Sequence, residues 1–199
     1  MERERRPMEL QHVNVKLFAR ANAEFDFGAL IPVFQNWIEK QSGDELLLDI
    51  ADYSHVHDGP GVVLIGHEGD YSVDNTDGRL GVRYNRKAVL DGGNQDRLIQ
   101  AARAALTAFA RLEADERVAG KLGFDGRGIE VFINDRLLAP NTESTRKAAE
   151  GEFQTFFRRL FGKPEWSLSY ASDPRRLFAA TAKVSAPLSL AELSANLGP

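Results

Sequence analysis

Apolar and polar residues alternate near the start of the chain. Val13, Val15 and Leu17 are separated by polar residues, and this period of two predicts a half-buried strand. The runs 45–53 and 61–66 are almost continuously apolar, which is typical of strands covered on both faces. The pattern therefore predicts one amphipathic strand followed by two central strands.

Helical periodicity appears between and after these strands. Residues 26–43 place Leu30, Phe34 and Ile38 at helical spacing, and the alanine-rich segment 95–115 repeats apolar residues in the same way. Turn residues and apolar patterns predict the remaining elements: strands at 79–88 and 127–139, a helix at 139–164 capped at Asn141 or Thr142, two strands within 165–185, and a helix at 188–197.

The order of these elements, β-α-β-β-β-α-β-α-β-β-α, predicts an α+β fold. We expect a single mostly antiparallel or mixed sheet with helices packed on it. The charged N-terminus has no apolar face, so residues 1–10 are expected to be a disordered tail and residues 11–199 a single α+β domain.

Composition restricts the function classes. The net charge of −4 offers no overall attraction for phosphate backbones or anionic lipid, so neither nucleic acid nor a membrane is an expected partner. The absence of cysteine excludes disulfides and thiolate chemistry. No apolar run approaches the roughly 20 residues that span a bilayer, and a cytoplasmic location is expected. No nucleotide-binding or dinucleotide-binding motif is present, and no cofactor is expected.

Three of the four histidines lie within residues 54–71. His55 and His57 have the H-x-H spacing that can turn both rings to one side of an extended segment, and His67 is the candidate third metal ligand. In an antiparallel hairpin, however, His67 would lie about 17 Å from the loop, at about 3.4 Å per residue. The favoured interpretation is a solvated loop that leads into a buried strand, with the metal site as the alternative.

Acidic residues on the same hairpin are candidate catalytic groups. Pairing of Tyr53 with Val62 would place Asp49 opposite Gly66. Glu68 would then lie diagonal to Asp49 on the same face, and a buried carboxylate pair of this kind holds one proton and can act as a general acid.

Asp52 and His67 complete the candidate catalytic set. Strand alternation places His67 on the face of Val63 and Ile65, so its ring is expected to be largely buried, more so than the rings of His55 and His57, and hydrogen-bonded to the protein.

Cations on the next hairpin offer a second interpretation of these acids. Glu68, Asp70 and Asp74 can form surface ion pairs with these cations, and each pair is worth at most about 1 kcal/mol. The cations could instead bind an anionic ligand, with a tyrosine beside them. The candidate ligand-binding residues are Arg83, Tyr84, Arg86 and Lys87.

The segments HVNVKLFA, DELLLDIADYSHV, GPGVVLIGHE and FINDRLLAPNT resemble a group of bacterial hypothetical proteins, some of them cyanobacterial, that have no established activity. The resemblance covers nearly the whole chain after the first ten residues. It implies a stand-alone bacterial protein and identifies no substrate or catalytic residue.

Two hypotheses of function follow. The first is a non-catalytic ligand-binding or assembly protein that binds a small molecule or a protein near residues 49–71. A homodimer is one form of this hypothesis, because the small side chains of segment 95–115 allow a sheet or a second subunit to approach closely. The alternative is a small-molecule hydrolase or related enzyme that uses Asp49, Asp52 and Glu68, with or without a metal at His55, His57 and His67.

Overall fold

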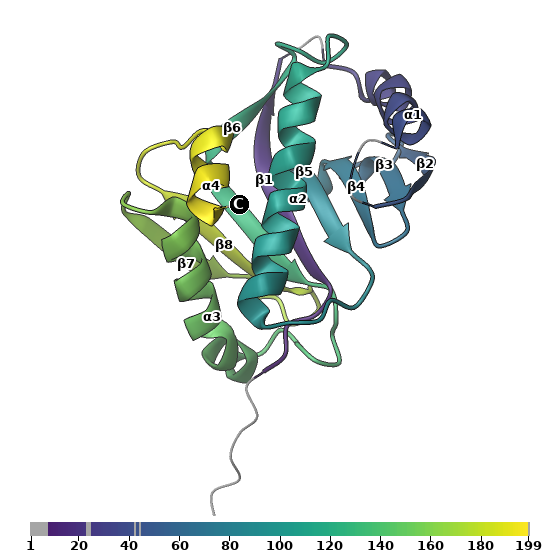
Figure 1. Ribbon diagram of the computed structural model, residues 1–199. Coiled ribbons are helices and arrows are strands. Elements are labelled where there is room, and N and C mark those ends of the chain that lie inside the picture. Colours follow the sequence, from purple (N-terminus) through teal and green to yellow (C-terminus); the bar gives the residue numbers. More distant parts are fainter. Residues whose placement is uncertain (1–7, 23–24, 42, 44, 199) are drawn as a thin grey trace, which may run out of the picture.

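One antiparallel sheet organises the molecule. The structure is a computed structural model that describes residues 8–22, 25–41, 43 and 45–198. Within these residues, eight strands form a single sheet in the order β2-β3-β4-β5-β1-β6-β8-β7, and four α-helices accompany it (Figure 1). This arrangement confirms the predicted α+β fold.

The element bounds are as follows. The strands are β1 (Val13–Ala21), β2 (Leu47–Tyr53), β3 (Gly61–Gly66), β4 (Gly69–Asp74), β5 (Gly81–Arg86), β6 (Leu122–Ile133), β7 (Trp166–Tyr170) and β8 (Phe178–Val184). The helices are α1 (Leu30–Lys40), α2 (Asn94–Ala114), α3 (Glu143–Phe161) and α4 (Leu190–Leu197), with short 3-10 turns at Phe27–Ala29 and Thr76–Gly78.

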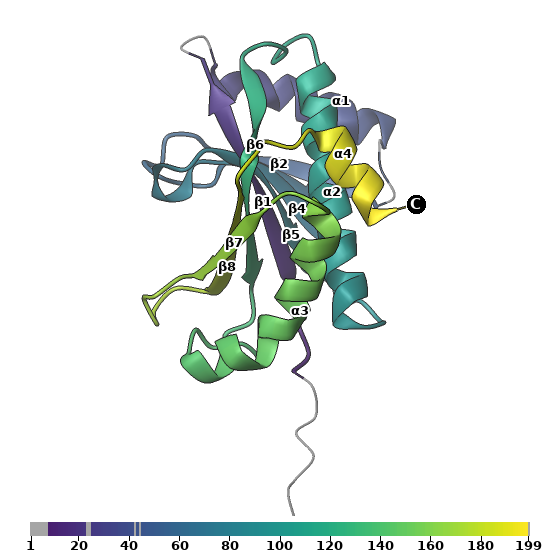
Figure 2. The same cartoon turned by 90° about the vertical axis from the view of Figure 1, so that its left-hand side faces the viewer.

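The central strand β1 separates two chemically different faces of the sheet. Val15 pairs with Tyr84 of β5 and with Val131 of β6, and all three side chains are buried under the helices. The next residue, Lys16, pairs with Arg83 and points to the opposite face. The helices lie on the first face, which we call the helix face, and loops border the second, which we call the open face (Figure 2).

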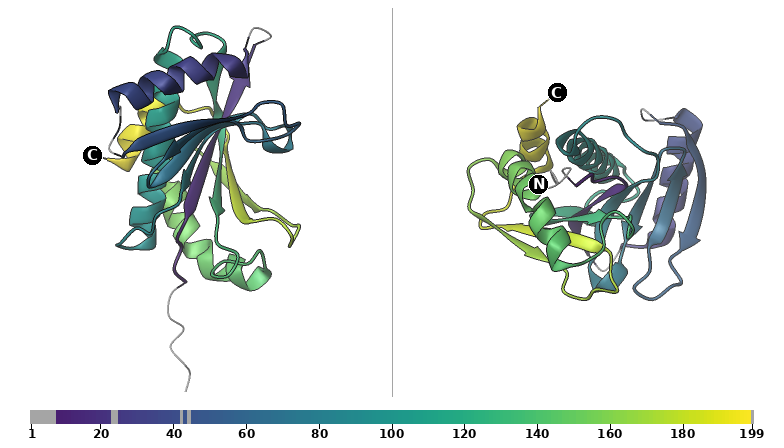
Figure 3. Two further views of the ribbon diagram at one scale, coloured as in Figure 1. Left: turned by 90° about the vertical axis from the view of Figure 1, so that its right-hand side faces the viewer. Right: turned by 90° about the horizontal axis from the view of Figure 1, so that it is seen from below.

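The alanines of α2 let this helix lie close to the strands. Ala101, Ala102 and Ala105 are buried, and α2 packs on β1 and β5. These small side chains therefore face the protein's own sheet. The homodimer stays a prediction. Helix α1 covers the β2 end of the same face, and α3 and α4 cover the β7 and β8 end (Figures 1 and 3).

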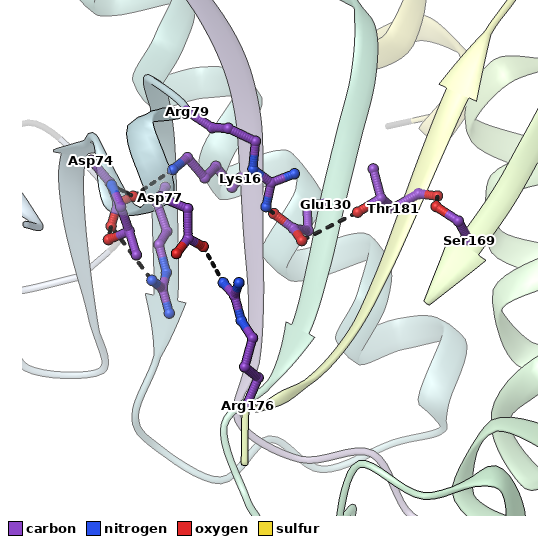
Figure 4. Close-up of polar contacts among 10 residues, drawn as sticks. Lys16, Asp74, Asp77, Arg79, Glu130, Ser169, Arg176 and Thr181 are labelled. Carbon is purple, nitrogen blue, oxygen red and sulfur yellow. Dashed lines mark hydrogen bonds and ion pairs between the residues drawn. The ribbon is translucent and has the colours of Figure 1, made fainter. Parts of the chain in front are cut away.

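Charged side chains shield the open face. Lys16 and Asp74 are almost fully buried there and form an ion pair with Nζ 2.5 Å from Oδ1 (Figure 4). Above them, the guanidinium of Arg79 lies 5.1 Å from the centre of the Phe18 ring, and that of Arg83 lies 4.7 Å from the centre of the Phe132 ring. The aliphatic parts of these arginine side chains cover the open face of the sheet, whereas helices cover the other face.

The structure corrects three expectations. The strand β4 was not predicted, because the two-residue turn of His67 and Glu68 that precedes it lacks the usual turn residues. Strand β6 begins at Leu122, five residues before the predicted start at 127. The predicted tail is wrong at Leu10, which is buried and whose N–H donates to Asn94 Oδ1 at 2.8 Å; residues 1–7 lie outside the described part.

In the described part of the chain, none of the helices combines the length and the apolar character needed to cross a membrane.

Candidate functional site

A groove of about 690 Å³ opens on the helix face between α1 and α2. One stripe of α2 forms its wall from Asp96 to Arg111, a length of about 22 Å at 1.5 Å per residue. Trp37 of α1 lies on the other side, and Tyr71 and Tyr84 of neighbouring strands border it from the sheet. The groove is therefore bordered by aromatic rings from α1 and from the sheet, and by polar side chains of α2.

Glu45 anchors the Tyr71 end of the groove. Its Oε1 accepts a hydrogen bond from the Tyr71 hydroxyl at 2.6 Å, and its Oε2 accepts from the backbone N–H groups of Glu68 at 3.1 Å and Gly69 at 2.8 Å. Gly66 makes room for this carboxylate, because a Cβ there would lie 2.8 Å from Glu45 Oε2. Burial, followed by the hydrogen bond to Glu45, raises the pKa of Tyr71 above its ordinary value.

Tyr84 occupies the middle of the floor, with its ring centre 5.0 Å from that of Tyr71. Its oxygen accepts a hydrogen bond from Gln100 Nε2 at 3.2 Å. Burial raises the pKa of Tyr84, although Gln100 and Arg86 oppose the shift. The ring fits only because residue 69 is glycine, since a Cβ there would lie 2.6 Å from the Tyr84 hydroxyl.

Arg86 and Arg111 are two of the four arginines that border the groove in the described part of the chain. The Arg86 guanidinium donates from NH1 to Glu68 Oε2 at 2.7 Å and from Nε to the Ala88 carbonyl at 2.9 Å, so Glu68 already neutralises it. Arg111 lies with its guanidinium carbon 4.0 Å from the centre of the Trp37 ring. Burial lowers the pKa of Arg111, and Tyr71 partly offsets that effect.

The predicted carboxylate pair does not form. Tyr53 pairs with Gly61 instead of Val62, so Asp49 lies opposite Ile65 on the open face, where it is exposed. Glu68 points toward Arg86 at the groove. The expectation failed because the loop between β2 and β3 sets a register one residue different from the expected one, from Tyr53 through Asp49.

The other candidate residues near this hairpin are exposed. Asp52 accepts a hydrogen bond from the backbone N–H of Ser54 at 2.8 Å. His67 is exposed in the turn after β3, so the expected burial of its ring is wrong; the strand ends at Gly66 and its alternation does not continue. His55 and His57 are exposed in the β2–β3 loop. Among the residues that the structure describes, no three His, Asp or Glu side chains are grouped as a metal site requires.

The four candidate ligand-binding residues divide between the two faces. Tyr84 and Arg86 border the groove, whereas Arg83 lies on the open face, as the alternation of β5 requires. Lys87 Nζ lies 2.6 Å from Asp70 Oδ1. The expected pairing of the acids with the cations of the next hairpin occurs between Glu68 and Arg86, between Asp70 and Lys87, and at 3.5 Å between Asp74 and Arg83. Asp74 is buried, however, so its pair is not at the surface.

The sequence interpretation missed several residues of the groove. They are Trp37, Glu45, Tyr71, Gln100 and Arg111. A signal was present for the last two, because polar Gln100 and Arg111 share a helical stripe with small Ala104 and Ala108 beside the apolar face of α2. Such a stripe is typical of a helix face that borders a cavity instead of the core.

Comparison of the chain with models of protein families, with curated proteins and with solved structures finds no match.

Proposed function

We propose that the chain is a non-catalytic binding protein that holds a small organic anion in the groove between α1 and α2. The observation that carries this proposal is the position of Arg111, whose guanidinium lies against the Trp37 ring at the border of a groove of about 690 Å³. A volume of this size suits a small organic molecule, and ligand pockets typically combine aromatic walls with a few placed polar groups.

The state of the polar groups favours binding over catalysis. The Glu45 carboxylate accepts hydrogen bonds on both oxygens, so it is poorly placed to take a proton from a substrate. The raised pKa values of Tyr71 and Tyr84 keep both phenols protonated near neutral pH. Of the acidic catalytic candidates, Asp49 and Asp52 lie away from the groove, and Glu68 is paired with Arg86.

The test uses 1-anilinonaphthalene-8-sulfonate, a fluorescent aromatic anion. Its binding is expected to quench Trp37 by energy transfer, and the quenching should be largely lost in Trp37→Phe, which leaves Trp166 beside Phe157 and Phe161 as the remaining tryptophan. Arg111→Gln is expected to weaken binding about tenfold, because a hydrogen bond to a charged group contributes about 1.5–3 kcal/mol.

Arg127→Gln is the matched control. Arg127 is exposed and does not border the groove, so this variant changes the net charge equally and should bind the probe as the unmodified protein does. Arg111→Lys keeps the charge but loses the planar donor and should give an intermediate affinity. Equal affinity of the Arg111→Gln and Arg127→Gln proteins, both folded by circular dichroism, would disprove anion binding at this groove.

A further inference from the structure

We infer that the chain forms a homodimer in which β7 pairs antiparallel with β7 of a second copy, with the two-fold axis at Leu168, so that the two sheets join into one. This inference goes beyond the proposed binding function, because it concerns the β7 edge of the sheet and the groove lies between α1 and α2.

Strand β7 offers unpaired backbone groups at the edge of the sheet. It is the end strand of the sheet that the described residues form, and its neighbour there is β8 (Figure 1). The backbone N–H of Ala171 donates to the Ala179 carbonyl, so residues in phase with Ala171 direct their N–H and C=O groups to β8. Trp166, Leu168 and Tyr170 are out of phase and direct theirs outward, where another strand can pair with them.

The two edges of the sheet differ in their protection against such pairing. The β2 edge has a bulge between Leu47 and Asp49, and both Asp49 and Asp52 are exposed there. Bulges and charges of this kind keep edge strands from joining other chains. The five residues of β7 include no charged side chain, and its pairing with β8 has no bulge. The sequence therefore blocks one edge and leaves the other able to pair.

The sequence of β7 is complementary to itself in one register. With Leu168 at the two-fold axis, Leu168 lies opposite its own copy, Trp166 lies opposite Tyr170 of the second copy, and Ser167 lies opposite Ser169. The side chains of Trp166, Leu168 and Tyr170 are only partly buried under α3, so the second copy would cover apolar surface that is still exposed. Aromatic and aliphatic cross-strand pairs of this kind stabilise a sheet.

Helix α3 runs antiparallel to β7 and shares the position of this axis. Its Phe157 packs on Trp166 with the ring centres 5.9 Å apart, and its Phe153 packs on Tyr170 with the ring centres 6.3 Å apart. Leu168 lies between these two contacts on the strand, so the part of α3 near Gln154 lies beside it. A two-fold axis at Leu168 therefore also relates the two halves of α3 to those of the second copy.

The charges on α3 fit this symmetry. Glu150 precedes Phe157 by seven residues, which places it on the β7 side of the helix, and Arg158 follows Glu150 by eight. Rotation about the axis brings Glu150 beside Arg158 of the second copy, and the reverse contact forms at the symmetric position. Both residues are exposed, and neither has an ion-pair partner among the described residues, whereas Glu143 and Lys147 pair within the helix. A second copy thus supplies the opposite charge that each of them lacks.

Sedimentation equilibrium between about 1 and 100 µM tests the assembly, because the fraction of dimer depends on the protein concentration. We expect a mass of twice 22.1 kDa at the upper concentration. Glu150→Arg brings like charges together at two symmetric places and should weaken dimerisation at least about fivefold, as should Arg158→Glu. The double variant Glu150→Arg/Arg158→Glu exchanges the charges and should recover the affinity. Glu39→Arg is the matched control, because Glu39 is exposed on α1; this variant should dimerise as the unmodified protein does.

A second pair of variants tests the register of β7. Ser167 and Ser169 are exposed on the open face, where Figure 4 shows Ser169. Ser167→Lys/Ser169→Lys places like charges opposite each other across the two β7 strands and should weaken dimerisation, whereas Ser167→Glu/Ser169→Lys places opposite charges there and should not. Amide hydrogen exchange should show more protection of the Leu168 N–H in the unmodified protein than in the two-lysine variant.

A mass of one chain at every concentration would overturn the inference. A dimer whose affinity is unchanged by Glu150→Arg or by the two lysines, with both variants folded by circular dichroism, would also overturn it, because that dimer would use another surface.

Discussion

At the scale of single residues, the open face contains the buried ion pair of Lys16 and Asp74, whose two members differ in how many other partners they have. Asp74 accepts hydrogen bonds from Lys16, from the N–H and hydroxyl of Thr76 and, at 3.5 Å, from Arg83. In the part of the chain that the structure describes, Asp74 is the one anion paired with the Lys16 ammonium. Burial lowers the pKa of Lys16, and Asp74 only partly offsets this effect. The charged form of Lys16 therefore depends on Asp74, whereas Asp74 keeps its other hydrogen-bond donors when Lys16 is removed.

Asp74→Asn is accordingly expected to be more destabilising than Lys16→Met. The first change leaves a buried cation without its anion, which costs about 3–5 kcal/mol of unfolding free energy, whereas the second leaves Asp74 with its other partners and costs about 1–3 kcal/mol. Urea unfolding at neutral pH measures both. The double variant should be less destabilised than the sum of the single changes, and a larger loss for Lys16→Met would contradict the asymmetry.

At the scale of elements, local signals account for where helices begin. Helix α3 starts after Thr142, whose hydroxyl accepts from the backbone N–H of Thr145 at 3.3 Å, as one of the two caps predicted from the sequence. The pairing of β3 with β4 had no comparable local signal. His67 and Glu68 form the turn between Gly66 and Gly69. Gly66 leaves room for Glu45 and Gly69 leaves room for Tyr84, and both of these side chains are distant in sequence.

The contribution of the α3 cap can be measured with two identical substitutions in one helix. Thr142→Ala is expected to lower the unfolding free energy by about 1 kcal/mol, because it removes the acceptor for a terminal N–H. Thr155→Ala is the control: Thr155 is exposed inside α3 and donates to the Gly151 carbonyl, so its loss should change stability by no more than about 0.5 kcal/mol. Equal losses in chemical denaturation would show that the cap contributes nothing specific.

At the scale of the whole molecule, several tyrosines link folding to alkaline pH. Burial raises the pKa of Tyr71, Tyr84 and Tyr170, with Glu45 adding to the first and Glu150 to the third. A folded-state pKa above the unfolded value means that the folded protein retains protons that the unfolded chain loses. The stability from these phenols is thus fully present below about pH 10 and is lost as the pH rises above it. Lys16 acts with the opposite sign, because its pKa is lowered on folding.

Tyr71→Phe should therefore reduce the loss of stability at alkaline pH. At about pH 11, one phenol that stays protonated only in the folded state accounts for up to about 1.4 kcal/mol. Urea unfolding between about pH 7 and pH 11 is expected to give parallel curves for the variant and the unmodified protein below pH 9, and a shallower decline for the variant above it. Parallel curves over the whole range would show that Tyr71 ionises equally in both states.

The sequence by itself determined the types of all the predicted elements, with β4 as the strand it missed, because each of these types depends on residues close in the chain. The alternation around Val15 and the alanine-rich stripe of α2 are local periodicities, and both were confirmed in β1 and α2. The residues of the groove were decided only by the tertiary structure. Trp37, Tyr71 and Arg111 become neighbours because α1 and α2 pack on one face of a sheet whose register, set partly by a bulge in β2, no local pattern specifies.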